Sequence, residues 1–356
     1  MKIVLVALCL LLALQAPANA EDFFENDGDA LYRIYDENGA YLTARAGRVF
    51  PGDEYIAAND RLYRVESVDE QAATARARYL GDEPPASRDA FAAYAEAGAK
   101  KLVCMYSTHS DESYHEGDGA ASKTEGAGIY DVGDAFKEHL ESHGVEVEYS
   151  DETFLPHDAG AYRRSSSTAK QLAQKAPAAL FDLHRDGIPD ASEYEHEVDG
   201  EETSKVRLEV GRSNANAQAN RAFAKQIKET ADDLYPGLIK DIYVGKGNYN
   251  QELYPKALLL EFGTHTLDKE LAVKSTEYMA DVVNEVLFGG TAKAATKAEN
   301  KGAGKGIAWA VGLAVLAAIV YALAATGTFR GMGNRLGRGV SEITGGLFGK
   351  KPKDRE

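Results

Sequence analysis

The sequence has very little cysteine. Only Cys9 and Cys104 occur among 356 residues, and Cys9 lies in an amino-terminal segment typical of a cleavable secretory signal. Cys104 would then be the only cysteine of the mature chain, so no disulfide bond within it is expected, even in an oxidising compartment. Because Cys104 lies in a strand-like apolar run, we interpret it as a small buried hydrophobic residue and not as a nucleophile.

Positive charge is also scarce. The chain has 40 Lys and Arg against 56 Asp and Glu, for a net charge of −16. The tail 329–356 carries +4 and Lys2 adds +1 to residues 1–20, so residues 21–328 carry −21. A body this acidic repels phosphate backbones, and nucleic acid is therefore not expected as a partner.

Long apolar runs are limited to two segments. Residues 1–20 combine Lys2, an apolar stretch and Ala18-Asn19-Ala20, a layout that predicts a signal peptide cleaved after Ala20. Residues 307–328 carry no charge and are long enough to cross roughly 30 Å of hydrocarbon. The basic tail that follows is expected in the cytoplasm. The sequence thus predicts a single-pass protein of the cell membrane, with its body outside the cytoplasm.

Between these runs the pattern changes from short alternating strands to alternating strands and amphipathic helices. Residues 21–82 predict a small all-β domain and residues 83–100 a linker. Residues 101–288 predict an α/β domain with a mainly parallel sheet and helices on both faces. Residues 289–306 read as a flexible tether to the membrane span. Ligands of such sheets gather at the carboxyl ends of the strands.

Polar residues follow three of the predicted strands at this edge. They are His109 and Glu112 after the first strand, His184 after the third, and Glu261 at the end of the last. Two histidines and a carboxylate are a typical ligand set for a catalytic zinc ion with an open fourth position. Glu261 ends a strongly apolar strand, where partial desolvation would raise its pKa towards the range of a general base.

Structural roles without metal binding or catalysis also stay open for these residues at this point. His109 and Glu112 could form a surface pair, His184 could be a strand-end histidine, and Glu261 could cap a helix. Two other carboxylates, Glu125 and Asp131, could replace Glu112 as the metal ligand. The remaining histidines, among them His157, are expected to be mostly solvated.

The region from Lys101 to Phe288 closely resembles the stage II sporulation protein P family, cell-wall hydrolases related to the zinc N-acetylmuramoyl-L-alanine amidases. Many ordered runs carry the resemblance, and together they are far more specific than any one motif. The runs are Thr108-His-Ser-Asp-Glu-Ser-Tyr114, Val132-Gly-Asp-Ala135, Leu140-Glu-Ser-His-Gly144, Ala161-Tyr-Arg-Arg-Ser165, Asp182-Leu-His-Arg-Asp186, Val210-Gly-Arg-Ser-Asn214, Tyr249-Asn-Gln251 and Leu258-Leu-Leu-Glu-Phe-Gly263.

The resemblance implies a zinc-dependent amidase that cuts between the lactyl group of the glycan and the L-alanine of the stem peptide. It also implies an association with endopeptidase cleavage of peptide cross-links. His109, Glu112 and His184 would hold Zn²⁺ and Glu261 would be the catalytic base. Four further residues match family positions and would orient substrate: Arg185, Tyr249, Asn250 and Gln251.

The resemblance further implies septal-wall remodelling during engulfment, with a lytic transglycosylase and a polytopic membrane protein as partners. An amino-terminal anchor would be expected for the family, whereas this sequence predicts a carboxy-terminal span. Two other readings remain: a metallo-carboxypeptidase or endopeptidase, and a non-catalytic wall-binding adaptor.

Overall fold

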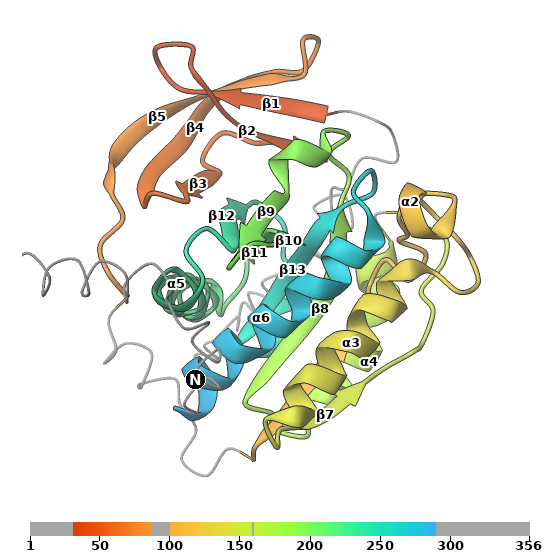
Figure 1. Cartoon of the computed structure of the whole chain (residues 1–356). Coiled ribbons are helices and arrows are strands. Elements are labelled where there is room, and N and C mark those ends of the chain that lie inside the picture. The colour runs from red at the N-terminus through yellow and green to blue at the C-terminus, as the bar shows by residue number, and fades with distance from the viewer. Residues whose placement is uncertain (1–30, 87–99, 159, 290–356) are drawn as a thin grey trace, which may run out of the picture. The chain divides into compact units, whose positions relative to one another are not determined.

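The computed structural model describes residues 31–86, 100–158 and 160–289, which belong to one compact unit. Eleven strands form one sheet in the order β2-β1-β5-β4-β3-β12-β11-β13-β8-β6-β7 (Figure 1). The strands are β1 (Leu31–Tyr35), β2 (Tyr41–Ala46), β3 (Glu54–Ala57), β4 (Arg61–Asp69), β5 (Thr74–Asp82), β6 (Leu102–Tyr106), β7 (Glu146–Tyr149), β8 (Ala179–Asp186), β11 (Val206–Gly211), β12 (Ile239–Gly245) and β13 (Ala257–Thr264). A separate two-stranded sheet pairs β9 (Glu195–Val198) with β10 (Glu201–Ser204).

The strands contributed by residues 101–288 pair mainly in parallel, as the sequence predicts. Strands β13, β8, β6 and β7 pair in parallel, as do β11 and β12, and only the β11–β13 pairing is antiparallel. The mainly parallel sheet predicted for residues 101–288 is therefore confirmed within a mixed α/β fold. One antiparallel pairing places the amino ends of β11 and β12 beside the carboxyl ends of β8 and β13.

Helices cover both faces of the sheet. One face carries α3 (Gly128–Ser142), α5 (Ala217–Leu234) and α6 (Lys269–Phe288), whose apolar residues share the main core with Val103, Phe181 and Leu260. In Figure 1, α3 and α6 run side by side across the strands. The opposite face carries α4 (Ala161–Ala173), which packs Ala169 and Leu172 against Cys104 and Leu180. The short helix α2 (His115–Asp118) follows β6.

The five amino-terminal strands extend the same sheet. Strand β3 pairs antiparallel with β12, with Ile56 opposite Ile242. Side chains of β1 to β5 form a core of their own that includes Tyr243 of β12. Residues 31–82, the described part of the small β domain predicted for residues 21–82, thus share a sheet with the α/β region and pack against Tyr243 of β12.

No helix among the described residues is long and apolar enough to cross a membrane. The predicted signal peptide (1–20), tether (289–306), membrane span (307–328) and basic tail (329–356) lie outside the described residues, apart from Gly289.

Arg207 of β11 joins the two parts of the sheet. Its guanidinium is fully buried and donates to Asp241 of β12 (2.7 and 3.0 Å) and to Asp186 of β8 (2.8 Å). It also donates to Thr43 Oγ1 (2.7 Å) and Ala44 O (3.0 Å) of β2. One cation therefore pairs with two buried carboxylates, the second of which also pairs with Lys240, and links β2 to β11.

We expect Arg207→Leu to lower the free energy of unfolding by about 3–5 kcal/mol, because it removes the cation paired with buried Asp186 and leaves buried Asp241 with Lys240 alone (3.0 Å). Urea unfolding followed by circular dichroism measures the change. Arg33→Leu, at an exposed position of β1, serves as the control and is expected to stay within about 0.5 kcal/mol of the parent. An unfolding midpoint for Arg207→Leu equal to that of the control would contradict this account.

Candidate metal centre

A tight turn after β6 brings His109 and Glu112 together. The Glu112 N–H donates to His109 O (3.1 Å), and the two side chains meet with His109 Nδ1 3.3 Å from Glu112 Oε1. The turn is anchored at Thr108, whose N–H and Oγ1–H both donate to the Asp182 carboxylate (2.8 and 2.6 Å). Both His109 and Glu112 are almost fully buried, so they do not form the surface pair that the sequence left open.

His184 reaches the same carboxylate from β8. Its Nδ1 lies 3.4 Å from Glu112 Oε1 and 3.3 Å from Oε2. With zinc-to-ligand bonds of about 2.0–2.2 Å, the donor atoms of a tetrahedral site lie about 3.3 Å apart. Glu112 Oε1 thus stands at that separation from one nitrogen of His109 and one of His184. These two separations match the spacing between ligands of a zinc ion.

The second carboxylate oxygen of Glu112 and the second ring nitrogen of His184 contact other groups of the protein. Glu112 Oε2 accepts from the Arg185 N–H (2.9 Å), which orients Oε1 towards the histidines. His184 Nε2 lies 3.0 Å from Asp182 Oδ1. A carboxylate at the outer nitrogen of a histidine is the usual companion of metal ligation. Asp182 therefore positions both His184 and, through Thr108, the loop that carries His109.

Charge around the three side chains favours a cation. Burial opposes a charge on His184, but Asp182 and Glu112 overcome it and hold the pKa of this imidazole well above its ordinary value. Burial likewise opposes ionisation of Glu112, yet His184 and Arg185 keep the pKa of this carboxyl far below its usual range. Two buried carboxylates facing two imidazoles make a site that a divalent cation would neutralise.

Glu261 stands beside this cluster on β13. It is the register partner of His184 in the parallel β8–β13 pairing, so both side chains point to the same face of the sheet. Burial, Asp186 and Glu112 raise the pKa of Glu261 well above its ordinary value, against the opposing charge of His184. Its Oε2 is buried and has no hydrogen-bond partner among the described residues. A carboxylate with a raised pKa is a stronger base than an ordinary glutamate, which suits it to accept a proton.

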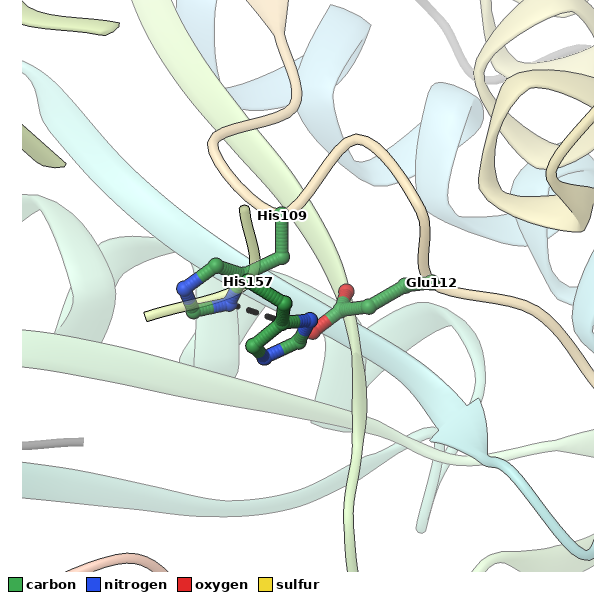
Figure 2. A group of neighbouring side chains, drawn as sticks. All are labelled: His109, Glu112 and His157. Atoms are coloured by element: carbon green, nitrogen blue, oxygen red, sulfur yellow. Dashed lines mark ion pairs between the residues drawn. The ribbon is translucent and has the colours of Figure 1, made fainter. Parts of the chain in front are cut away.

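The structure adds His157 to the site, which the sequence analysis treated as solvated. The donor atoms of His109, Glu112 and His157 all lie within 4.8 Å of one another. Figure 2 shows the three side chains converging, and the His157 ring stacks on His109 with a centroid separation of 4.0 Å. Its loop follows β7, which runs parallel to β6, so this strand end was the available sequence signal.

The two rival carboxylates lie elsewhere. Glu125 is exposed, and Asp131, also exposed, pairs with Lys269 at 2.5 Å. Of the three carboxylates that the sequence left open, Glu112 is the one next to His109 and His184.

Arg185 lies next to the metal-ligand loop. Its guanidinium donates to Ser113 O (3.1 Å) and Ala121 O (2.9 Å), and its Nη1 lies 3.9 Å from Glu112 Oε1. These contacts hold the loop after His109 in place. A role for Arg185 in orienting substrate stays a prediction.

The other three predicted substrate residues are buried on the face that holds the site. The Tyr249 ring packs against Tyr162, and the Asn250 amide donates to Tyr162 O (3.0 Å). The Gln251 amide donates to Glu209 O (2.9 Å). Both amides therefore shape the loop after β12, and contact of these residues with substrate also stays a prediction.

Comparison with known proteins matches residues 53–284 to the family model described as "Stage II sporulation protein P (SpoIIP)". The chain is 29% identical over 221 residues to the stage II sporulation protein P of Bacillus subtilis, a match that covers 57% of this chain. It spans about half the length of that relative, 55%.

Similar solved structures include the N-acetylmuramoyl-L-alanine amidase AmiC2 of Nostoc punctiforme, with 16% identity and a TM-score of 0.32 over 54% of this chain and 98% of that one. Another is the CwlD amidase of Clostridioides difficile, in complex with the GerS lipoprotein, with 12% identity and a TM-score of 0.35 over 52% and 94%. Because the family model covers most of the sheet and every residue of the candidate centre, this chain belongs to the stage II sporulation protein P family.

Proposed function

We propose that the chain is a zinc-dependent peptidoglycan hydrolase that cleaves the N-acetylmuramoyl-L-alanine amide bond during septal-wall remodelling in sporulation. The observation that carries this proposal is the buried pair of histidines sharing Glu112, each with a nitrogen 3.3 Å from its carboxylate, beside Glu261. Membership of a sporulation family supports the proposed setting.

Zinc, when bound, would polarise the scissile carbonyl and lower the pKa of a water molecule to about 7. His109, Glu112 and His184 would hold the ion. Glu261 would accept a proton from the attacking water and return it to the leaving nitrogen of L-alanine, which needs that proton to depart as an amine. Burial raises the pKa of Glu261, which strengthens its carboxylate as the acceptor of that proton.

Asp182 and Arg185 would hold the metal ligands in position. Asp182 would keep His184 Nδ1 directed at the ion by occupying Nε2, and the Arg185 N–H would keep Glu112 in one orientation. The predicted topology completes the proposal: a signal peptide and a span at 307–328 would place this site outside the membrane, facing the wall. A lytic transglycosylase and a polytopic membrane protein are the partners proposed with it.

The test is the set of products from purified peptidoglycan. An amidase is expected to release intact stem peptides with a free L-alanine amino group and to leave free lactyl ends on the glycan. Shortened stems without free lactyl ends would replace the amidase assignment with a carboxypeptidase or endopeptidase. Wall binding without any product would favour a non-catalytic adaptor.

Metal removal gives an independent prediction. Dialysis against a strong chelator is expected to reduce wall cleavage to background, and stoichiometric Zn²⁺ is expected to restore it, since the ligands lie on a folded scaffold. Cleavage is measured as release of dye-labelled peptidoglycan, with Mg²⁺ in place of Zn²⁺ as the control. Full activity in the chelated protein would contradict the zinc dependence.

A further inference from the structure

We propose that Asn250, in the loop after β12, is a positioning residue of the metal centre that fixes the orientation of His184 through a chain of hydrogen bonds. The inference rests on the proposed function for the identity of the metal. It goes beyond that function because it assigns Asn250 a role through a metal ligand and not through contact with substrate. It also links the loop after β12 to the ligand strand β8.

The chain begins at the metal ligand. His184 Nε2 lies 3.0 Å from Asp182 Oδ1, and the other oxygen of that carboxylate accepts from Thr108 Oγ1–H at 2.6 Å. Thr108 Oγ1 lies 2.8 Å from Ser165 Oγ of α4. The Thr108 hydroxyl has one proton, which goes to Asp182, so the Ser165 hydroxyl is the donor in the second contact. The carboxylate that orients His184 is thus held by a hydroxyl that α4 holds in turn.

Asn250 is the far end of this chain. Its amide nitrogen donates to Ser165 Oγ (3.0 Å) and to Tyr162 O (3.0 Å). Both amide protons are therefore used within the protein, and Asn250 is only 2% exposed. Each hydroxyl of the chain accepts one hydrogen bond and donates the next, an arrangement in which neighbouring bonds strengthen one another. The amide of Asn250 thereby acts on the carboxylate beside His184.

The backbone of this turn is strained. Tyr249 and Asn250 follow each other with φ of +56° and +55°, in the left-handed region. Asparagine tolerates this region better than most residues, but a bulky residue such as tyrosine rarely adopts it. Strain of this kind persists only where the surroundings fix it, and it is concentrated at functional sites. The turn therefore depends on contacts that hold it in place.

Those contacts come from two other strands. Arg45 Nη2 of β2 donates to Tyr249 OH (3.0 Å). The Gln251 amide donates to Glu209 O (2.9 Å), and its Oε1 accepts from the Gly211 N–H (2.8 Å). The turn is thus fixed to β2 and β11, which makes it a firm support for the chain that ends at the metal ligand. Through Arg45, the amino-terminal strands also contribute to the centre.

The experiment measures the zinc affinity of the full-length protein in competition with a chromophoric chelator. Asn250→Gly and Ser165→Ala break the chain at two places, and glycine adopts a φ of +55° without strain. Each variant is expected to bind zinc about 10-fold more weakly than the wild type, the lower end of the usual effect of losing a group that orients a ligand. The double variant is expected to lose no more than either single variant, because both substitutions break the same chain.

A kinetic measurement separates positioning from contact with substrate. With a soluble muramoyl peptide as substrate and saturating zinc, Asn250→Gly is expected to lower kcat and leave KM at the wild-type value. The matched control is Ala176→Gly, which places glycine at another position of positive φ, +51°, outside the chain. It should keep the wild-type zinc affinity, kcat and KM.

Wild-type zinc affinity in both Asn250→Gly and Ser165→Ala would overturn the inference. A raised KM with unchanged zinc affinity would do the same, because Asn250 would then act on substrate. Losses that add in the double variant, or an equal loss in Ala176→Gly, would also contradict it. A wild type that binds no zinc would remove the proposed function together with the inference, whereas unaffected variants of a zinc-binding wild type would remove the inference alone.

Discussion

His184→Ala is expected to lose zinc and wall cleavage together. The substitution removes the buried nitrogen that lies 3.3 Å from Glu112, and it leaves the carboxylates of Glu112 and Asp182 without the imidazole between them. Zinc affinity is expected to fall by at least about 100-fold and cleavage of labelled peptidoglycan to fall to background. Metal content by mass spectrometry and dye release measure the two effects on the same preparation.

The matched control is His139→Ala. His139 lies on α3, which packs on the opposite face of the sheet, and it belongs to no metal-binding group among the residues that the structure describes. Its removal should leave zinc content and cleavage at the parental values. Far-ultraviolet circular dichroism must show the parental helix content for both variants. A folded His184→Ala protein that still cleaves the wall would remove this residue from the centre and reopen the assignment of the remaining ligands.

The parts of the fold that followed from sequence are those set by local pattern. Apolar runs such as Leu258–Leu260 and the amphipathic helices between them predict a covered, mainly parallel sheet, which the structure has. The pairing of β3 with β12 joins residues about 185 positions apart, and no local pattern specifies it. Arg207 adds a second long-range link, because its buried guanidinium on β11 donates to Thr43 and Ala44 of β2.

The residues of the candidate site also differ in how far a local sequence pattern could predict them. His184 and Glu261 stand in or beside apolar strands, and a polar side chain in such a run is informative because burial makes it costly. Glu112 could not be separated from Glu125 and Asp131 by sequence, since the choice depends on how a loop turns. His157 lies in the loop between β7 and α4, so its place after a parallel strand was a weak sequence signal, and its position over His109 follows from how that loop folds.

Glu261→Gln is expected to retain zinc but to lower the rate of wall cleavage by about 10²- to 10⁴-fold, the usual contribution of a general base. The amide keeps the shape of the carboxyl but cannot accept the proton of the attacking water. Zinc content and turnover are measured together. Glu138→Gln, an exposed substitution on α3, is the control and should leave both unchanged. A rate within a few-fold of the wild type would rule out Glu261 as the base.

The same substitution should stabilise the metal-free protein, and the pH dependence of this gain follows from the sign of the pKa shift. Because burial and neighbouring carboxylates raise the pKa of Glu261 in the folded state, its ionisation costs stability as pH rises from about 4.3, the ordinary value, through the raised pKa. Glutamine does not ionise. Glu261→Gln and the wild type should therefore be equally stable near pH 4, and the variant should be more stable by at least about 1 kcal/mol at pH 8. Urea unfolding in the presence of chelator tests this, and a gain independent of pH would mean that Glu261 is not held at a raised pKa. A carboxylate on a buried strand is therefore expected to lower the stability of the fold, although the reaction needs the same carboxylate as its base.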